Sequence, residues 1–250
     1  MHRFFLPPDQ ICGDTACILG GDHLHLTRVL RARVGDGLIL LDNAGNAFQA
    51  VLVTLGKAEA TARIECRLGL PAEPGIFLTV AQALGKGDKF EQVIQHGTEI
   101  GASGFLPVRA ERCVADIPAG KVGERVARWR LVAKGAAEQS GRARIPEIAE
   151  PLSFTTLLQQ VVAGDSLALL LHPSEDAVPL RTLLDGLPAP PARLLLAVGP
   201  EGGWSPAEVS AARAANLRPV SLGRRVLRTE TAALVALSQI LYAFESVASG

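Results

Sequence analysis

The sequence predicts a two-part α/β protein, in which a small β-barrel precedes a mostly parallel sheet flanked by helices. From about residue 75 onward, apolar runs of strand length alternate with helical stretches, a pattern typical of parallel sheets. Residues 194–208 read as a buried strand, a glycine-rich loop and a helix start. Before residue 70, short apolar or alternating runs follow one another, as in barrels and meanders.

In the first part, strands are expected over residues 38–41, 47–53 and 61–67. Residues 42–46 and 55–57 separate them with turn-forming side chains. Ahead of these strands, residues 21–31 favour a short helix that Asp22 caps and whose Leu26, Val29 and Leu30 face inward. Its positive charge has two open interpretations, a solvated helix face and an RNA-contact patch.

Residues 68–75 carry two glycines and two prolines and form the best candidate linker. A strand over 76–84 follows, and then a helix that Asp88 caps and Gly101 ends. Strands are expected over 105–108 and 112–116. A long helix comes next, with its inward side chains at Val122, Val126, Trp129, Ala133 and Ala136.

Residues 147–158 read as a connection and a short helix that Ser153 or Thr155 caps. Buried strands are expected over 167–171 and 194–198, and a shorter strand over 219–222. The terminal helix presents a core face made of Leu234, Leu237, Leu241, Phe244 and Val247. The three leucines of this face fit a subunit interface as well as a core.

The bulk composition indicates a cytoplasmic protein. Basic and acidic residues balance at 25 each, so no strong overall field attracts nucleic acid and any RNA contact must be local. The longest apolar run, 167–171, is far too short to span a bilayer, and prolines 7 and 8 argue against a signal peptide. The four cysteines are scattered without zinc spacing, so no metal is expected.

The stretch 194–208 has the parts of a ligand cradle. Gly199, Gly202 and Gly203 let the backbone approach a ligand closely. Ser205 and Glu208 then form a capping box around Pro206. A tight turn without a ligand is the plainer alternative.

A second glycine turn, residues 222–232, brings three arginines together beside this cradle. The apolar Leu222, Val226 and Leu227 suggest a pocket for adenine, in which backbone groups line the edge and these side chains pack. A GxGxxG fingerprint is absent, which argues against an ordinary dinucleotide fold.

Together, Gly199–Trp204 and Leu222–Ala232 resemble the two cofactor loops of the SPOUT methyltransferases. The resemblance implies a C-terminal trefoil knot and S-adenosyl-L-methionine (SAM) as cofactor. It assigns nine residues to cofactor binding: Leu171, His172, Gly199, Glu201, Gly203, Leu222, Gly223, Val226 and Leu227.

Motifs along nearly the whole chain resemble the ribosomal RNA small subunit methyltransferase E family. They lie at residues 3–5, 23 with 29–31, 35–36, 86–91, 98–101 and 137–142 and in both loops. The resemblance implies a PUA-like RNA-binding barrel over 1–70 and a SPOUT methyltransferase domain over 75–250. It further implies a homodimer that methylates N3 of uridine 1498 in 16S rRNA, within the small ribosomal subunit or its free rRNA. His96-Gly97 and Gly135 depart from the family pattern.

The reaction needs N3 of uridine to lose a proton, so it calls for a base or for cations that stabilise the anion. Glu138 is the candidate base, and Arg142 and Arg228 are the candidate cations. For Glu138, a polar helix end is an equal alternative. For Arg142 and Arg144, phosphate contact is favoured over catalysis. The candidate RNA contacts are Arg3, His23, Arg28, Arg31, Arg142, Arg144, Arg224 and Arg225.

Two other functions fit parts of this pattern. One is a SPOUT enzyme that methylates a ribose 2′-hydroxyl or a different base. The other is an RNA-binding module without catalysis. The intact loop glycines argue against the module, because a protein without a cofactor has no evident need for them.

Overall fold

The computed structural model describes residues 1–69, 73–174 and 177–244. Contacts divide the chain into two units. Unit 1 consists of Met1–Glu73 and Ala137–Ile145, and unit 2 of Pro74–Ala136 and Pro146–Gly250. The expected domain boundaries are 1–70 and 75–250. In the structure, residues 137–145 also belong to the unit of the N-terminal strands, which these boundaries do not include. Residues 70–72 of the expected linker lie outside the described residues.

Unit 1 is built on a sheet whose strands pair in the order β1-β4-β5-β6-β3-β2. All pairs are antiparallel except β1 with β4. The three expected strands are present, as β4, β5 and β6. The strands are β1 (His2–Phe5), β2 (Ile11–Cys12), β3 (Thr15–Leu19), β4 (Gly37–Leu41), β5 (Ala47–Leu55) and β6 (Glu59–Leu68).

One contiguous apolar core lies against this sheet. Alternate residues of the strands point into it, as the period of two requires. It contains Phe4, Leu6, Ile18, Leu26, Leu38, Leu40 and Leu52, together with alanines 16, 50, 60 and 62. The hairpin between β4 and β5 is closed by Asp42, which accepts from the N–H groups of Ala44 and Asn46 at 2.8 and 3.0 Å. Burial raises the pKa of Asp42, but hydrogen bonds from Asn46 and Ala44 outweigh it and hold the pKa below its ordinary value.

The expected helix over 21–31 is wrong in its details. The structure has a short α1 (Gly20–Leu24) that continues as a π-helix, η2 (His25–Val29). Asp22 is not the N-cap but lies in the first turn of α1, and the N-cap is Leu19, which makes no side-chain cap bond. The π-helical turn is wider than an α-helical one and is closed by a hydrogen bond from the Leu30 N–H to the His25 C=O at 3.0 Å. The wider turn changes which side chains face the core. Leu26 is therefore buried as expected, whereas Val29 is 68% exposed.

The segment 137–145 is tied to unit 1 by polar contacts. Glu138 accepts from the Phe5 N–H at 3.1 Å. The Ile145 N–H donates to Asn43 Oδ1 at 2.7 Å, and Arg144 Nη2 donates to the Ala44 carbonyl at 2.7 Å. Ala137 joins a small cluster with Phe5, Leu41 and Ala47. This segment includes the end of helix α3 (Val122–Ser140), which therefore starts in unit 2 and ends in unit 1.

Unit 2 contains the expected parallel sheet. Its strands follow the order β10-β8-β7-β13-β11-β14-β12, with β9 paired to β8, and every pair is parallel. The strands are β7 (Phe77–Ala83), β8 (Gly104–Arg109), β9 (Glu147–Ile148), β10 (Leu152–Ser153), β11 (Leu167–Leu171), β12 (Val178–Pro179), β13 (Arg193–Val198) and β14 (Arg218–Ser221).

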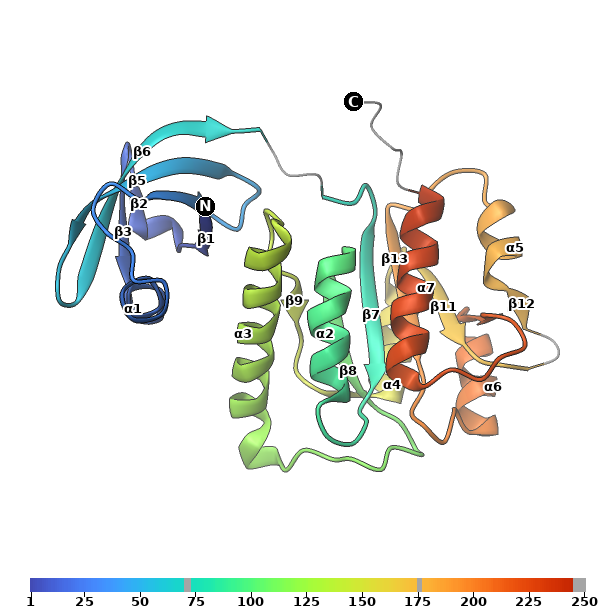
Figure 1. Ribbon diagram of the computed structural model, residues 1–250. Helices are drawn as coiled ribbons and strands as arrows, with labels where there is room; N and C mark the ends of the chain where they lie inside the picture. Colours follow the sequence, from blue (N-terminus) through green and yellow to red (C-terminus); the bar gives the residue numbers. More distant parts are fainter. Residues whose placement is uncertain (70–72, 175–176, 245–250) are drawn as a thin grey trace. The chain divides into compact units, whose positions relative to one another are not determined.

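Helices cover both faces of this sheet. In Figure 1, α2 and α7 lie on one face and α4 and α6 on the other. Residues 194–198 of β13 are consequently all buried, which explains the continuous apolar run. Besides α3, the helices of unit 2 are α2 (Lys89–Ile100), α4 (Phe154–Ala163), α5 (Leu180–Asp185), α6 (Pro206–Ala214) and α7 (Thr229–Phe244). Short 3-10 turns occur at η3 (Ala119–Lys121) in unit 2 and at η1 (Pro8–Gln10) in unit 1.

The expected caps and helix faces of unit 2 are mostly confirmed. Ser205 and Glu208 form the capping box of α6, and Ser153 caps α4. Asp88 stands at the N-cap of α2 but makes no side-chain bond there. In α3, Val126, Trp129, Ala133 and Ala136 are buried.

Two expectations for unit 2 need correction. Residues 112–116 form no strand, because the Cys113 N–H closes a turn onto the Ala110 carbonyl at 3.0 Å. On α7, Leu237 and Leu241 are buried with Ala233, Ala236 and Ile240, whereas Leu234 and Phe244 are half-buried. Core packing therefore accounts for Leu237 and Leu241, which removes them from an expected subunit interface. Val247 lies outside the described residues.

In the part of the chain that the structure describes, no helix is both long and apolar enough to cross a membrane.

Candidate functional site

A cavity of about 500 Å³ opens at the carboxyl ends of β11, β13 and β14. This is the edge where open parallel α/β sheets hold their ligands. All nine residues expected to bind a cofactor line it: Leu171, His172, Gly199, Glu201, Gly203, Leu222, Gly223, Val226 and Leu227. Residues far apart in the sequence thus meet around one space, which lies within unit 2.

The first loop of the cavity is anchored by Trp204, which is 3% exposed. Its indole Nε1 donates to the Leu171 carbonyl at 3.1 Å and so joins the loop to the end of β11. A Cβ on Gly199 would lie only 3.1 Å from that Nε1, so a larger residue there would have to displace the ring. Glycine at 199 lets the indole pack closely against the backbone.

The second loop shapes the opposite wall. Gly223 has φ +101°, a conformation that favours glycine. Leu222 and Leu227 are half-buried, as expected of packed side chains. Val226 does not pack, since it is 91% exposed. This corrects the expectation that the Val226 side chain packs, although the residue still lines the cavity.

A charged cluster lies at the cavity. Lys89 Nζ is 2.7 Å from Glu201 Oε1 and 3.8 Å from Glu230 Oε2. The hydrogen bond to Glu201 raises the pKa of Lys89 above its ordinary value. Burial raises the pKa of Glu201, but the hydrogen bond and charge of Lys89 and the backbone hydrogen bonds together outweigh it, so the pKa lies below its ordinary value. Both groups are therefore charged at neutral pH.

Lys89 was not predicted as a site residue, although it lies in one of the family-like motifs. Its partner Glu201 is 112 residues away, and no periodicity in a single sequence reports such a distance. Arg225 and Arg228 also line the cavity. The cavity thus offers groups of both signs beside apolar walls.

The three expected catalytic residues are divided between the units. Arg228 lines the cavity in unit 2. Glu138 and Arg142 belong to unit 1, where Glu138 accepts from Phe5. Arg142 pairs with Glu73, with its Nη2 at 2.6 Å and its Nε at 3.2 Å from Glu73 Oε2. These contacts give Glu138 and Arg142 a structural part in unit 1.

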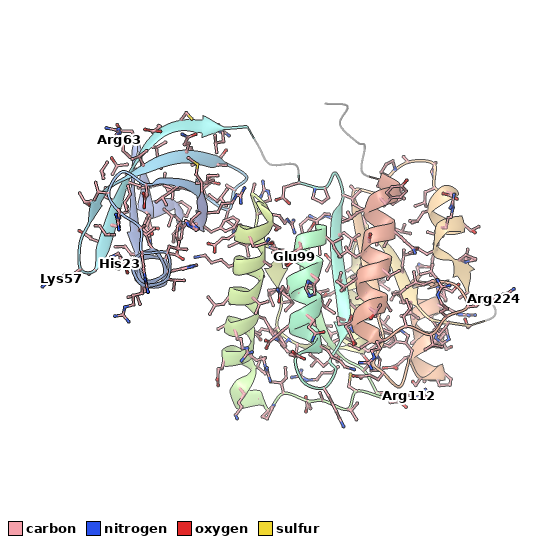
Figure 2. The ribbon with its side chains drawn as sticks, in the orientation of Figure 1. His23, Lys57, Arg63, Glu99, Arg112 and Arg224 are labelled. Carbon is pink, nitrogen blue, oxygen red and sulfur yellow. The ribbon has the colours of Figure 1, made fainter. Side chains whose placement is uncertain are left out.

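The residues expected to contact RNA also differ in their solvent exposure. His23 is 4% exposed and its Nε2 lies 3.1 Å from the Gly56 carbonyl; Arg142 is 7% exposed. Both side chains are largely buried, and their contact with RNA stays a prediction. Arg28, Arg31, Arg144, Arg224 and Arg225 are exposed, and Arg3 is half-buried against Gly141. Arg224 points away from the ribbon of its loop (Figure 2).

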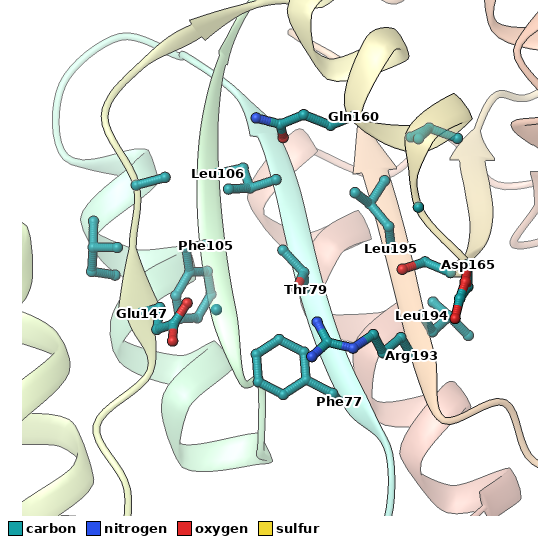
Figure 3. Close-up of a pocket in the computed structure, with 16 residues that line it drawn as sticks. Phe77, Thr79, Phe105, Leu106, Glu147, Gln160, Asp165, Arg193, Leu194 and Leu195 are labelled. Atoms are coloured by element: carbon teal, nitrogen blue, oxygen red, sulfur yellow. The ribbon is translucent and has the colours of Figure 1, made fainter.

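A second cavity of about 500 Å³ lies at the amino ends of β7, β8 and β13. There the Arg193 guanidinium stacks over the Phe77 ring at 4.9 Å (Figure 3). None of the expected site residues lines it. Because parallel sheets bind ligands at the other edge, this cavity is the weaker candidate.

Comparisons with known proteins show the family of the chain. Residues 72–241 match the family model of the RNA methyltransferase domain, and residues 22–65 match that of the RNA methyltransferase PUA domain. The ribosomal RNA small subunit methyltransferase E of Synechocystis sp. is 38% identical over 245 residues, which are 98% of this chain and 78% of that protein. The chain belongs to the ribosomal RNA small subunit methyltransferase E family.

Two solved structures extend the likeness to the whole fold. A methyltransferase from Legionella pneumophila, in complex with SAM, has a TM-score of 0.88 at 32% identity and covers 96% of this chain and 97% of its own. The family's enzyme from Neisseria gonorrhoeae, bound to SAM, has a TM-score of 0.86 at 30% identity and covers 98% of both chains. The expected α/β fold with an N-terminal PUA domain is confirmed, whereas the knot stays a prediction.

Proposed function

We propose that this chain methylates N3 of a uridine in 16S rRNA, uridine 1498 by family resemblance, with SAM as methyl donor. The modification would take place during maturation of the small ribosomal subunit. The observation that carries the proposal is the convergence of the nine expected cofactor residues around one cavity. Family membership gives this convergence its chemical meaning.

The cavity suits SAM in size and chemistry. Its volume of about 500 Å³ lies within the range of about 300–1,000 Å³ common for small-molecule sites. Apolar Leu171, Leu222 and Leu227 offer walls for the adenine. Lys89 and Glu201 offer one charge of each sign, which suits the zwitterionic amino-acid end. When bound, SAM supplies a methyl group from its sulfonium.

For the transfer, the chain has to make N3 of uridine nucleophilic. We propose that Arg228 stabilises the negative charge that develops when the N3 proton leaves, because it is the expected catalytic residue that lines the cavity. Catalytic roles for Glu138 and Arg142 also stay proposals. Their contacts to Phe5 and Glu73 favour a structural role instead. The target base must be unpaired for N3 to be reached.

We further propose that the exposed arginines contact rRNA phosphates. Arg28 and Arg31 would do so from unit 1, and Arg224 and Arg225 from unit 2. The protein is proposed to be a cytoplasmic homodimer that meets 16S rRNA or the small subunit. Since Leu237 and Leu241 are buried in the chain itself, a dimer interface has to use other residues. Sedimentation velocity tests the dimer, and a monomer at all concentrations would contradict it.

Methyl transfer from radiolabelled SAM to small subunits that lack the modification tests the proposal. Naked 16S rRNA runs alongside, and the labelled nucleoside is identified by chromatography. We expect 3-methyluridine. A ribose-methylated or other nucleoside would contradict the target chemistry, and protein that binds SAM and RNA without transferring label would be an RNA-binding module.

Arg228→Met provides the matched test of the site. We expect it to reduce turnover by about 100-fold, as loss of one charge-stabilising group does, while SAM binding is retained. Arg181→Met is the control, because Arg181 is exposed on α5 and pairs only loosely with Asp185 at 3.4 Å. Equal activity of both variants would remove Arg228 from the reaction.

A further inference from the structure

A buried polar side chain lies behind the cavity wall. Gln82, near the end of β7, is 2% exposed. Its Nε2 donates to Thr229 Oγ1 at 2.7 Å and to the Ala83 carbonyl at 3.2 Å. Its Oε1 has no hydrogen-bond partner in the described part of the chain. A buried amide that leaves one group unpaired is costly, so its placement calls for a reason beyond packing.

The hydrogen bonds run in one direction. Since the Ala83 carbonyl can only accept, the amide nitrogen of Gln82 must face it and Thr229. The Thr229 hydroxyl accepts from Gln82 and therefore has its own proton free to donate. It donates to the Gly199 carbonyl at 2.6 Å. Gln82 thus fixes the orientation of the hydroxyl that holds Gly199.

This chain of bonds joins three parts of the cavity wall. Gln82 belongs to β7, Thr229 is the first residue of α7, and Gly199 begins the loop after β13. Gly199 and Thr229 line the cavity, whereas Gln82 is not among the lining residues. Gly199 is also packed against the Trp204 indole. The Gly199 peptide is therefore held both by a hydrogen bond and by a packed ring.

We propose that Gln82 and Thr229 are positioning residues for the methyl donor, which set the Gly199 peptide in the orientation that SAM requires. The inference rests on the proposed function, since it takes SAM to be the ligand of this cavity. Gln82 acts through Thr229 and does not itself touch the ligand. Neither residue is among the nine that the loop motifs assigned to cofactor binding, although Thr229 lies within the second loop motif.

The test compares SAM affinities by calorimetry on the full chain. Thr229→Val keeps the shape and removes the hydroxyl, and we expect its Kd to rise about tenfold, which is about 1.4 kcal/mol. Thr229→Ser keeps the hydroxyl and is expected to bind within about threefold of the wild type. Gln82→Met is expected to weaken binding as Thr229→Val does, and the double variant to be no weaker than either single one.

Two controls separate positioning from general damage. Ile240→Val alters the buried face of the same helix away from the cavity and should leave the Kd unchanged despite a lower melting temperature. In turnover assays, Thr229→Val should raise the KM for SAM and leave the KM for RNA unchanged.

Each outcome decides something. If wild-type protein fails to bind SAM, the proposed function falls and the inference falls with it. If wild-type protein binds and Thr229→Val binds equally well, or if Thr229→Ser is as weak as Thr229→Val, the inference alone is overturned. Additive losses in the double variant would also overturn it, because two residues in one chain of bonds are coupled.

Discussion

At the scale of single residues, the two glycines that depart from the family pattern have opposite surroundings. Gly135 is exposed in α3, and a Cβ added there meets nothing within 4 Å. Gly97 is buried in α2, and a Cβ there would lie 2.9 Å from two atoms of the Phe105 ring. Phe105 is itself fully buried. One glycine thus weakens its helix, and the other makes room for a neighbour.

We therefore expect opposite changes from the same substitution. Gly135→Ala should raise the free energy of unfolding by about 0.5–1 kcal/mol, since alanine favours the helix. Gly97→Ala should lower it by about 1–3 kcal/mol, because the added methyl overpacks the core. Urea unfolding measures both. A stabilised Gly97→Ala would mean that the Phe105 ring moves aside freely.

The Lys89–Glu201 pair gives a prediction for pH. The Glu201 pKa is held below its ordinary value of 4.5, so its contribution to stability is present above pH 4.5 and is lost as the pH falls through the lowered pKa. The Lys89 pKa is raised above 10.5, so its contribution is present below pH 10.5 and is lost above the raised value. Lys89→Met removes both.

The stability difference between wild type and Lys89→Met should thus be constant from about pH 5 to 10 and shrink on either side. Thermal unfolding over pH 3–11 measures it, with pH values spaced about one unit apart. Arg181→Met is the control, because the exposed Arg181–Asp185 pair should contribute little at any pH. A difference that stays constant below pH 4.5 would rule out the depressed Glu201 pKa.

At the scale of elements, Glu208 joins two segments at the start of α6. Its Oε2 accepts from the Ser205 N–H at 2.9 Å within the capping box, and its Oε1 accepts from the Glu111 N–H at 2.8 Å. The side chain is 8% exposed. Since Arg112 Nη1 also donates to the Gly202 carbonyl at 3.1 Å, the segment 111–112 fastens the first cofactor loop.

Glu208→Gln should cost more stability than Ser205→Ala. A glutamine would turn its NH₂ toward one of the two backbone N–H donors and leave that donor buried without an acceptor, at about 1–3 kcal/mol. Loss of the Ser205 hydroxyl should cost about 1 kcal/mol, as N-cap removal does. Urea unfolding compares them, and equal losses would mean that the Glu111 contact adds nothing.

The secondary-structure features that could be predicted from the sequence are those that depend on residues close together in the chain. The capping box of α6, the apolar strand at 194–198 and the helical face of Val126 and Trp129 each depend on residues a few positions apart. The π-helical turn at His25–Val29 was not predictable, because its inserted residue leaves the apolar spacing almost unchanged.

Parts of the site were predictable for a different reason. The nine cavity residues came from the resemblance of two loops, and both loops end strands of one parallel sheet. Gln82 and Lys89 could not be predicted as site residues, because their hydrogen-bond partners lie 147 and 112 residues away in the sequence. The packing of segment 137–145 with the N-terminal strands was not predictable, because its contacts with Phe5, Asn43 and Glu73 are long-range.

At the scale of the whole molecule, the cavity and the Glu73–Arg142 ion pair belong to different units. A ligand that binds only folded unit 2 should therefore stabilise that unit, and loss of the ion pair should weaken only unit 1. Because Arg142 is 7% exposed, Arg142→Met leaves the Glu73 carboxylate without its cation, at a cost of about 3 kcal/mol for a largely buried pair.

Hydrogen exchange read residue by residue tests this division. SAM at about 100 times its Kd should add about 2.7 kcal/mol to the opening free energy of the slowest amides in β7, β11 and β13, with β4 and β5 unchanged. Arg142→Met should speed exchange in β4 and β5 and leave β11 and β13 as they are. If SAM protected both sheets equally, the units would unfold as one cooperative body, since helix α3 runs through both.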